Sequence, residues 1–128
     1  MRLLKLVFIL PLLFISSCQN QAELTEITII NPEEMKVLLK ENEVQLVDVR
    51  TVEEFNKHFI QGAENIVFDD NFDIKLDHLD KEKPVVVYCK KGGRSGRCAK
   101  VLQQKGFKKI YDLKGGLSQW IKEGNEVE

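Results

Sequence analysis

The chain has 128 residues, and its 19 lysines and arginines nearly balance its 20 aspartates and glutamates, for a formal net charge of −1. This length suits a single small domain with one hydrophobic core. The absence of a basic excess argues against a nucleic-acid-binding protein, so we expect no nucleic acid among the partners.

Residues 1–17 have the pattern of an export signal that is removed from the mature protein. Arg2 and Lys5 form a basic start, and residues 6–15 form an apolar run that is too short to span a bilayer. The run ends at Ser16-Ser17-Cys18, which resembles a bacterial lipoprotein signal. An ordinary secretory signal or a single-pass anchor is the alternative.

Cleavage before Cys18 would leave this residue lipidated at the new N-terminus. Residues 18–26 are then a short polar tether to the membrane. The prediction is therefore an exported, membrane-anchored lipoprotein on the periplasmic face or the cell surface.

Apolar runs and helical patterns alternate along the rest of the chain. Taken in chain order, we expect a strand at 27–30, a helix starting at 31–34, a strand at 44–49, a helix at 52–59, a strand at 65–68, a helix at 72–79, a strand at 85–88, a helix at 95–105, a strand at 109–113 and a helix at 116–122. This alternation predicts an α/β fold with a mostly parallel sheet and helices on both faces. Residues 124–128 are expected to be a frayed tail.

Cys89 occupies the most informative position, directly after the apolar run 85–88 and before the expected helix. Loop N–H groups can form an anion-binding nest there, and the helix N-terminus adds partial positive charge. Lys90, Lys91, Arg94 and Arg97 add full positive charges. All of these lower the pKa of a thiol, which favours a reactive thiolate over a buried, inert cysteine.

The pattern Cys-x-x-Gly-x-Arg-Ser, from Cys89 to Ser95, resembles the active-site loop of rhodanese-type sulfurtransferases. Further segments are similar to the family's other signatures in the same order; they are residues 46–50 with 53–55, residues 58–66, and residues 113–116 with Trp120. Lys57 and Gln61 depart from the family's usual glycine and proline. The resemblance covers residues 27–123 and implies one five-stranded rhodanese-like domain.

The resemblance implies sulfur transfer from a donor such as thiosulfate to cyanide or a thiol, including a protein thiol, through a persulfide on Cys89. The implied loop residues are Lys90, Lys91, Gly92, Gly93, Arg94 and Ser95. We expect Arg94 to tie the loop to a carboxylate, and Asp48 and Arg50 to support it, with Arg50 spaced to pair with Glu54. No metal site and no cofactor are expected.

Three rival functions remain open. A cysteine phosphatase needs Cys-x5-Arg, whereas only four residues separate Cys89 from Arg94. A non-catalytic binding or scaffold module would not need an intact cysteine. A thiol–disulfide oxidoreductase is disfavoured because there is no Cys-x-x-Cys, and Cys98 fits the apolar stripe of its helix better than a resolving role.

Overall fold

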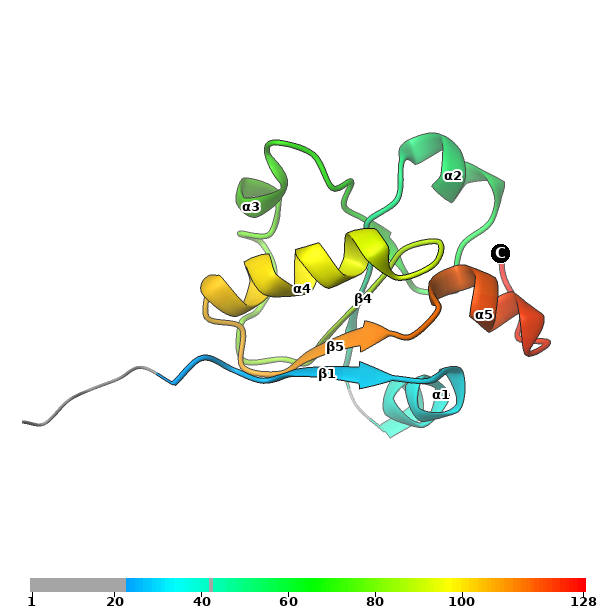
Figure 1. The fold of residues 1–128 in the computed structure, drawn as a ribbon, viewed down its shortest axis with the longest axis horizontal. Helices are drawn as coiled ribbons and strands as arrows, with labels where there is room; N and C mark the ends of the chain where they lie inside the picture. Colours follow the sequence, from blue (N-terminus) through cyan, green and yellow to red (C-terminus); the bar gives the residue numbers. More distant parts are fainter. Residues whose placement is uncertain (1–22, 42) are drawn as a thin grey trace, which may run out of the picture.

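The computed structural model describes residues 23–41 and 43–128. Five strands form one parallel sheet in the order β1 (Ile27–Ile30), β5 (Ile110–Leu113), β4 (Val85–Tyr88), β2 (Gln45–Asp48) and β3 (Glu64–Asn65) (Figure 1). The helices are α1 (Pro32–Glu41), α2 (Val52–Lys57), α3 (Phe72–Lys75), α4 (Gly93–Gln104) and α5 (Gly116–Lys122). The predicted α/β class, with a parallel sheet between helices, is confirmed.

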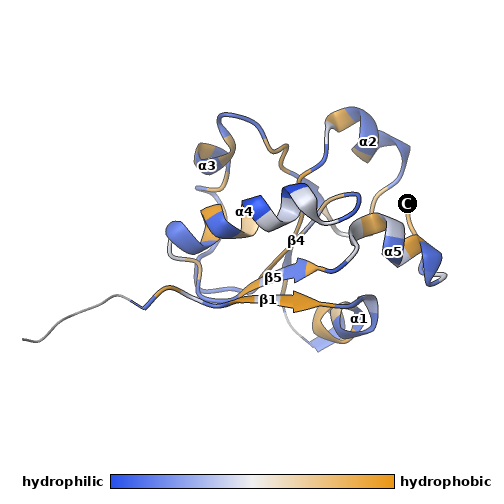
Figure 2. Ribbon diagram, viewed as in Figure 1, coloured by the Kyte–Doolittle hydropathy of each residue, from blue (hydrophilic) through white to orange (hydrophobic). Residues whose placement is uncertain are grey.

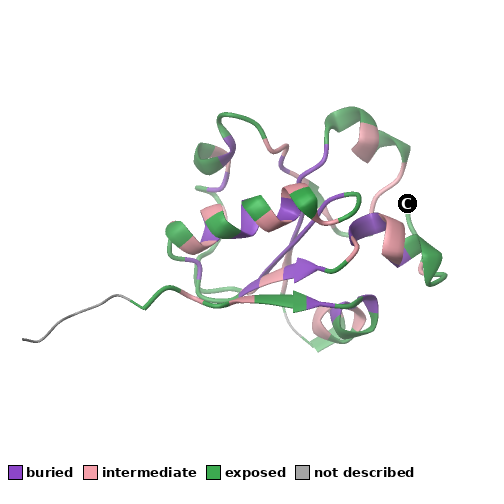
Figure 3. Ribbon diagram, viewed as in Figure 1, coloured by how far each residue is buried: buried purple, intermediate pink, exposed green. Residues whose placement is uncertain are grey.

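Alternation along β4 divides the core into two layers, one on each face of the sheet. Val85, Val87 and Cys89 point into the cluster that also holds Cys98, Ala99 and Leu102 of α4. Val86 and Tyr88 point into the opposite cluster, which holds Met35 of α1 and Leu117 and Trp120 of α5. Such a continuous apolar run is typical of a parallel strand that is covered on both faces. Figures 2 and 3 show β4 as apolar and buried, and the outer side of α4 as exposed.

Several element boundaries differ from the sequence-based prediction. The strand expected at 65–68 is β3 at Glu64–Asn65, although Phe68 N–H still donates to Val49 O at 3.1 Å. The helix expected at 72–79 ends at Lys75. Helix α2 ends at Lys57 because His58 is extended, with φ −172°.

Helix α4 begins at Gly93, two residues earlier than predicted. Gly92 precedes it in the left-handed region, with φ 115°, which a residue without a Cβ adopts at little cost. The loop after Cys89 is therefore shorter than the sequence indicates, and Arg94 and Ser95 lie in the first turn of the helix.

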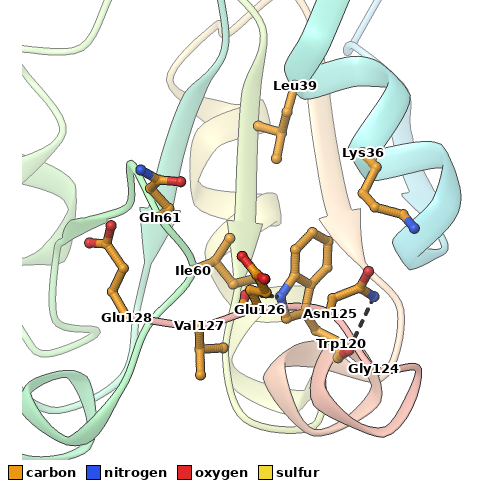
Figure 4. Close-up of a pocket in the computed structure, with 10 residues that line it drawn as sticks. All are labelled: Lys36, Leu39, Ile60, Gln61, Trp120, Gly124, Asn125, Glu126, Val127 and Glu128. Atoms are coloured by element: carbon orange, nitrogen blue, oxygen red, sulfur yellow. Dashed lines mark hydrogen bonds between the residues drawn. The ribbon is translucent and has the colours of Figure 1, made fainter.

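The C-terminal residues pack against the domain rather than fraying, which corrects the prediction for 124–128. Glu128 and Phe59 exchange two backbone hydrogen bonds, at 2.8 and 2.9 Å, and Trp120 Nε1 donates to Glu126 O at 2.9 Å. The tail borders a cavity of about 810 Å³ between α1, Ile60 and Trp120, on the face of the sheet opposite Cys89 (Figure 4). Hydrogen bonds between Phe59 and Glu128, which are far apart in the chain, cannot be read from a polar sequence.

Within residues 23–41 and 43–128, no helix is long and apolar enough to cross a membrane. The predicted signal at 1–17, the lipidation site Cys18 and the first part of the tether lie outside the described residues.

Candidate active site

Cys89 lies at the carboxyl end of central strand β4, where parallel α/β sheets place their sites. Its side chain is 1 % exposed. The backbone reverses through Gly92, and the Gly92 N–H donates to Cys89 Sγ at 3.0 Å. The N-terminus of α4 thus points at the sulfur, and its partial positive charge favours an anion there.

Ser95, in the first turn of α4, provides the second contact to the thiol. Its Oγ lies 3.5 Å from Cys89 Sγ. Burial raises the pKa of Cys89, but the hydrogen bond with the Ser95 hydroxyl and those from the backbone N–H groups of Ser95, Gly92 and Lys91 together outweigh it. The pKa of Cys89 therefore lies below the ordinary thiol value, as a reactive cysteine requires.

The start of α5 holds the other side of the reactive loop. Leu117 N–H donates to Cys89 O at 2.8 Å, and Ser118 N–H donates to Lys90 O at 2.9 Å. Gly116 allows this approach, because a Cβ at that position would lie 2.4 Å from Cys89 O. Gly116 also has φ 58°, which disfavours other residues. The Gly115-Gly116 pair thus fixes the carbonyls of the loop.

Arg94 binds the carboxylate of Glu54 through two hydrogen bonds, at 2.7 and 3.0 Å. These bonds, together with those from Thr51, lower the pKa of Glu54 to about 2 although partial burial opposes the shift. Thr51 and Glu54 also cap α2 reciprocally. The structure identifies Glu54 as the carboxylate that the sequence leaves unnamed, and it joins α2 to the reactive loop.

Asp48 and Arg50 form a buried ion pair at the end of β2, beside β4. Arg50 Nη2 lies 2.7 Å from Asp48 Oδ2 and donates to His58 O at 2.8 Å. The expected pairing of Arg50 with Glu54 is wrong, because each has a better placed partner. The Asp48–Arg50 pair orients the backbone around the site and does not contact the sulfur through any hydrogen bond of the described residues.

Of the remaining loop residues, Lys91 reaches the thiol through its backbone N–H. Lys90 and Lys91 are exposed, as is Gly93. Lys90 lines a cavity of about 260 Å³ between α2 and α5, together with Lys57 and His58. Arg50 and Glu54 also line this cavity, and its three cations outnumber its one carboxylate, so it would suit an anionic molecule near the loop.

Cys98 is fully buried on α4 and is a free thiol, as is Cys89. Burial raises the pKa of Cys98 to about 12, which keeps it protonated. The two cysteines therefore have opposite environments, and the predicted packing role of Cys98 agrees with its place in the core.

Asp112 is a site residue that the sequence-based analysis missed. It is 8 % exposed, lies in β5, and accepts a hydrogen bond from Ser95 Oγ at 2.7 Å. The available signal was a carboxylate on an inward-facing strand position, directly before the Leu113-Lys114-Gly115-Gly116 segment.

Comparisons with known proteins agree on one family. The model of the rhodanese-like domain matches residues 31–123. The chain is 30% identical over 101 residues to the thiosulfate sulfurtransferase GlpE of Glaesserella parasuis, covering 79% of this chain and 93% of that protein. It is 39% identical over 92 residues to the uncharacterized protein YqhL of Bacillus subtilis, covering 67% and 72%.

A solved structure supports the same assignment. The polysulfide-sulfur transferase homodimer of Wolinella succinogenes superposes with a TM-score of 0.69 at 31% identity, covering 80% of this chain and 78% of that one. The family model spans most of the domain, and the cysteine loop, the Gly115-Gly116 turn and strands β2 to β5 lie within it. The chain therefore belongs to the rhodanese-like domain family.

Proposed function

We propose that this protein is a sulfurtransferase that carries a sulfane sulfur on Cys89. The observation that carries the proposal is the environment of the Cys89 sulfur, which receives the Gly92 N–H at 3.0 Å and lies 3.5 Å from the Ser95 hydroxyl. The relative from Glaesserella parasuis is named a thiosulfate sulfurtransferase, which favours thiosulfate as the donor.

In the first step, the Cys89 thiolate attacks the outer sulfur of thiosulfate. A new S–S bond forms, the sulfur–sulfur bond of thiosulfate breaks, and sulfite leaves with the bonding electron pair. In the second step, an acceptor thiolate or cyanide attacks the outer sulfur of the persulfide, and the Cys89 thiolate departs. The Gly92 N–H, 3.0 Å from Cys89 Sγ, can donate to the thiolate that attacks in the first step and departs in the second.

Intact-protein mass after incubation with thiosulfate tests the proposal. We expect the wild type to gain the mass of one sulfur atom, because the loop donor stabilises the attacking thiolate. Cys89→Ser should abolish the adduct, whereas Cys98→Ser, which alters a buried core thiol, should retain it. An adduct that depends on Cys98 alone would show that Cys89 is not the nucleophile, and no adduct would reject thiosulfate as the donor.

The donor requires a separate comparison. The Wolinella succinogenes relative is named a polysulfide-sulfur transferase, so polysulfide is the alternative donor. We expect thiosulfate to load Cys89 at least as fast as polysulfide. Loading by polysulfide only would retain the sulfurtransferase but replace its substrate.

We also propose that the protein is a membrane-anchored lipoprotein, modified on Cys18. Support comes from the apolar run that ends at Ser16-Ser17-Cys18. Cells should hold the protein in the membrane fraction with an acylated Cys18, and Cys18→Ala should block this processing. Release of the wild type as a soluble, unacylated protein would contradict the proposal.

A further inference from the structure

The Ser95 hydroxyl lies between two acidic groups. Its Oγ is 3.5 Å from Cys89 Sγ on one side and 2.7 Å from Asp112 Oδ1 on the other. A third neighbour, Gly92 O, is 3.2 Å away. A hydroxyl has a single proton to donate and two lone pairs that accept, so Ser95 cannot donate to both acids at once.

Asp112 is held in an unfavourable place for a charge. It lies on β5 opposite Val87 of β4, and a Cβ on Gly96 of α4 would make ordinary van der Waals contact with its Oδ2, at 3.7 Å. Burial raises the pKa of Asp112 above its ordinary value, although the Ser95 hydrogen bond opposes this shift. Asp112 is therefore protonated more readily than an exposed aspartate.

The direction of the two hydrogen bonds depends on which group carries the charge. When Asp112 is ionised, it accepts a hydrogen bond from the Ser95 hydroxyl. A lone pair of Ser95 Oγ then accepts a hydrogen bond from the Cys89 S–H. When Asp112 is neutral, its own O–H can donate to Ser95 Oγ, which frees the Ser95 proton for a Cys89 thiolate. Ser95 thus stabilises the anion of only one partner at a time.

We propose that Asp112 is a positioning residue that acts through Ser95 to set how readily Cys89 loses its proton. The two acids then titrate as a coupled pair, with each ionisation opposing the other. The proposal rests on the proposed function for its consequence, since the thiolate is the form that takes sulfur. When the negative charge passes from Asp112 to Cys89, one proton moves from the thiol to the carboxylate, and none is released to solvent.

Other ionisable groups near the pair come from the same part of the fold. Arg94 and Cys98, both on α4, interact electrostatically with Cys89. Cys98 also interacts with Asp112, while Arg97 and Arg94 both act on Cys98. Ser95 is the group that hydrogen-bonds to both Cys89 and Asp112.

The test is the pH dependence of Cys89 alkylation by iodoacetamide, read on the Cys89 peptide of the full chain so that Cys18 and Cys98 do not contribute. Asp112→Asn keeps the shape but removes the acid. We expect the midpoint of the alkylation profile of this variant to move to lower pH by about half a unit or more. At a pH below the midpoint, alkylation should then be at least about threefold faster than in the wild type. Asp77→Asn removes an exposed carboxylate, bound to Lys105, and should leave the profile unchanged.

A double-mutant cycle with Ser95→Ala separates a bridged pair from a distant charge. Ser95→Ala alone removes the hydroxyl that bridges the two acids. In that background, Asp112→Asn should produce a smaller shift than in the wild type. An unchanged midpoint in Asp112→Asn, a shift to higher pH, or the same shift in both backgrounds would overturn the proposal.

A measurement without a variant at position 112 covers the case in which Asp112→Asn does not fold. The carboxyl ¹³C signal of Asp112 should show a step at the pH where Cys89 ionises, and Cys89→Ser should remove that step. A signal that ignores Cys89 would overturn the coupling. Alkylation and carboxyl titration need no sulfur donor, so their outcome is independent of whether the protein transfers sulfur.

Discussion

At the scale of single residues, Gly116 is the position where one added methyl group has the largest predictable effect. Alanine there would place a Cβ 2.4 Å from Cys89 O and 2.7 Å from Lys90 O at φ 58°. We expect Gly116→Ala to lower the free energy of unfolding by about 2–4 kcal/mol and to reduce sulfur transfer, because α5 must move away from the loop. Denaturant unfolding and a thiocyanate assay measure both effects.

Gly106→Ala is the matched control for this prediction. Gly106 also has a positive φ, of 87°, but an added Cβ would meet no atom within 4 Å. Gly106→Ala should lower the free energy of unfolding by about 1 kcal/mol through backbone strain, without affecting the reactive loop after Cys89. Equal losses of stability and activity in the two variants would show that the contact with Cys89 O does not matter.

Glu54 predicts a dependence of stability on pH. Its pKa of about 2 in the folded protein lies below the ordinary 4.5, mainly because of the Arg94 hydrogen bond. The stabilisation is therefore complete above about pH 4.5 and is lost as the pH falls toward 2. Relative to the wild type, Glu54→Gln should lose about 1–2 kcal/mol at pH 7, since the pair is partly exposed, and progressively less as the pH falls from 4.5 toward 2.

Unfolding curves at several pH values measure this difference. Glu53→Gln is the control, because Glu53 is an exposed neighbour in the same helix turn. A difference between Glu54→Gln and the wild type that does not change between pH 7 and pH 3 would contradict the ion-pair explanation.

The sequence predicts which residues form the site better than it predicts the hydrogen-bond partners of those residues. Cys89 and Gly92 can be identified from the strand, loop and helix pattern, because their roles depend on neighbours in the chain. Partners of Arg94 and Ser95 lie 40 and 17 residues away, and their pairing depends on the sheet order. Asp112 was missed for this reason.

At the scale of elements, the length of the reactive loop separates two chemistries. Inserting one glycine between Lys91 and Gly92 would restore the Cys-x5-Arg spacing of phosphatases. The insertion displaces the Gly92 N–H, now 3.0 Å from the sulfur, and the start of α4. We expect sulfur transfer to fall by about 10²-fold, the usual effect of losing one anion-stabilising donor.

Thiocyanate formation and hydrolysis of a small aryl phosphate, measured on the same preparations, test this prediction. The wild type should form thiocyanate and hydrolyse the phosphate negligibly. Phosphate release that depends on Cys89 and exceeds thiocyanate formation in the wild type would favour the phosphatase alternative. A rate unchanged by the insertion would show that the donors need not converge on the sulfur.

The predictability of each element follows the strength of its pattern. Strand β4 and helix α5 match the sequence-based boundaries, because an unbroken valine run and a helix with an apolar face leave few alternatives. Strand β3 and helix α3 are short and rich in polar residues, so their sequence patterns do not define where they end. Their boundaries were therefore predicted less accurately.

At the scale of the molecule, the strand order β1-β5-β4-β2-β3 could not be predicted from the sequence. The alternation of strands and helices indicates a parallel sheet, but many orders satisfy it, and the choice depends on long-range packing. The order places the ends of β2, β4 and β5 side by side. This arrangement brings Asp48, Cys89 and Asp112 to one edge of the sheet.

The two core layers share one sheet, so they should unfold together. Trp120, the single tryptophan, reports on the layer with α1 and α5, and the buried thiol of Cys98 reports on the opposite layer. Leu102→Ala removes a fully buried side chain beside Cys98 and should cost about 2–5 kcal/mol. We expect the denaturant midpoints of Trp120 fluorescence and of Cys98 labelling to fall equally, although Leu102 lies in the other layer from Trp120.

Ile74→Ala, at a residue 64 % exposed, should change neither midpoint. A Trp120 transition that stays in place while Cys98 becomes reactive would mean that the layers unfold independently, since the sheet would then fail to couple them.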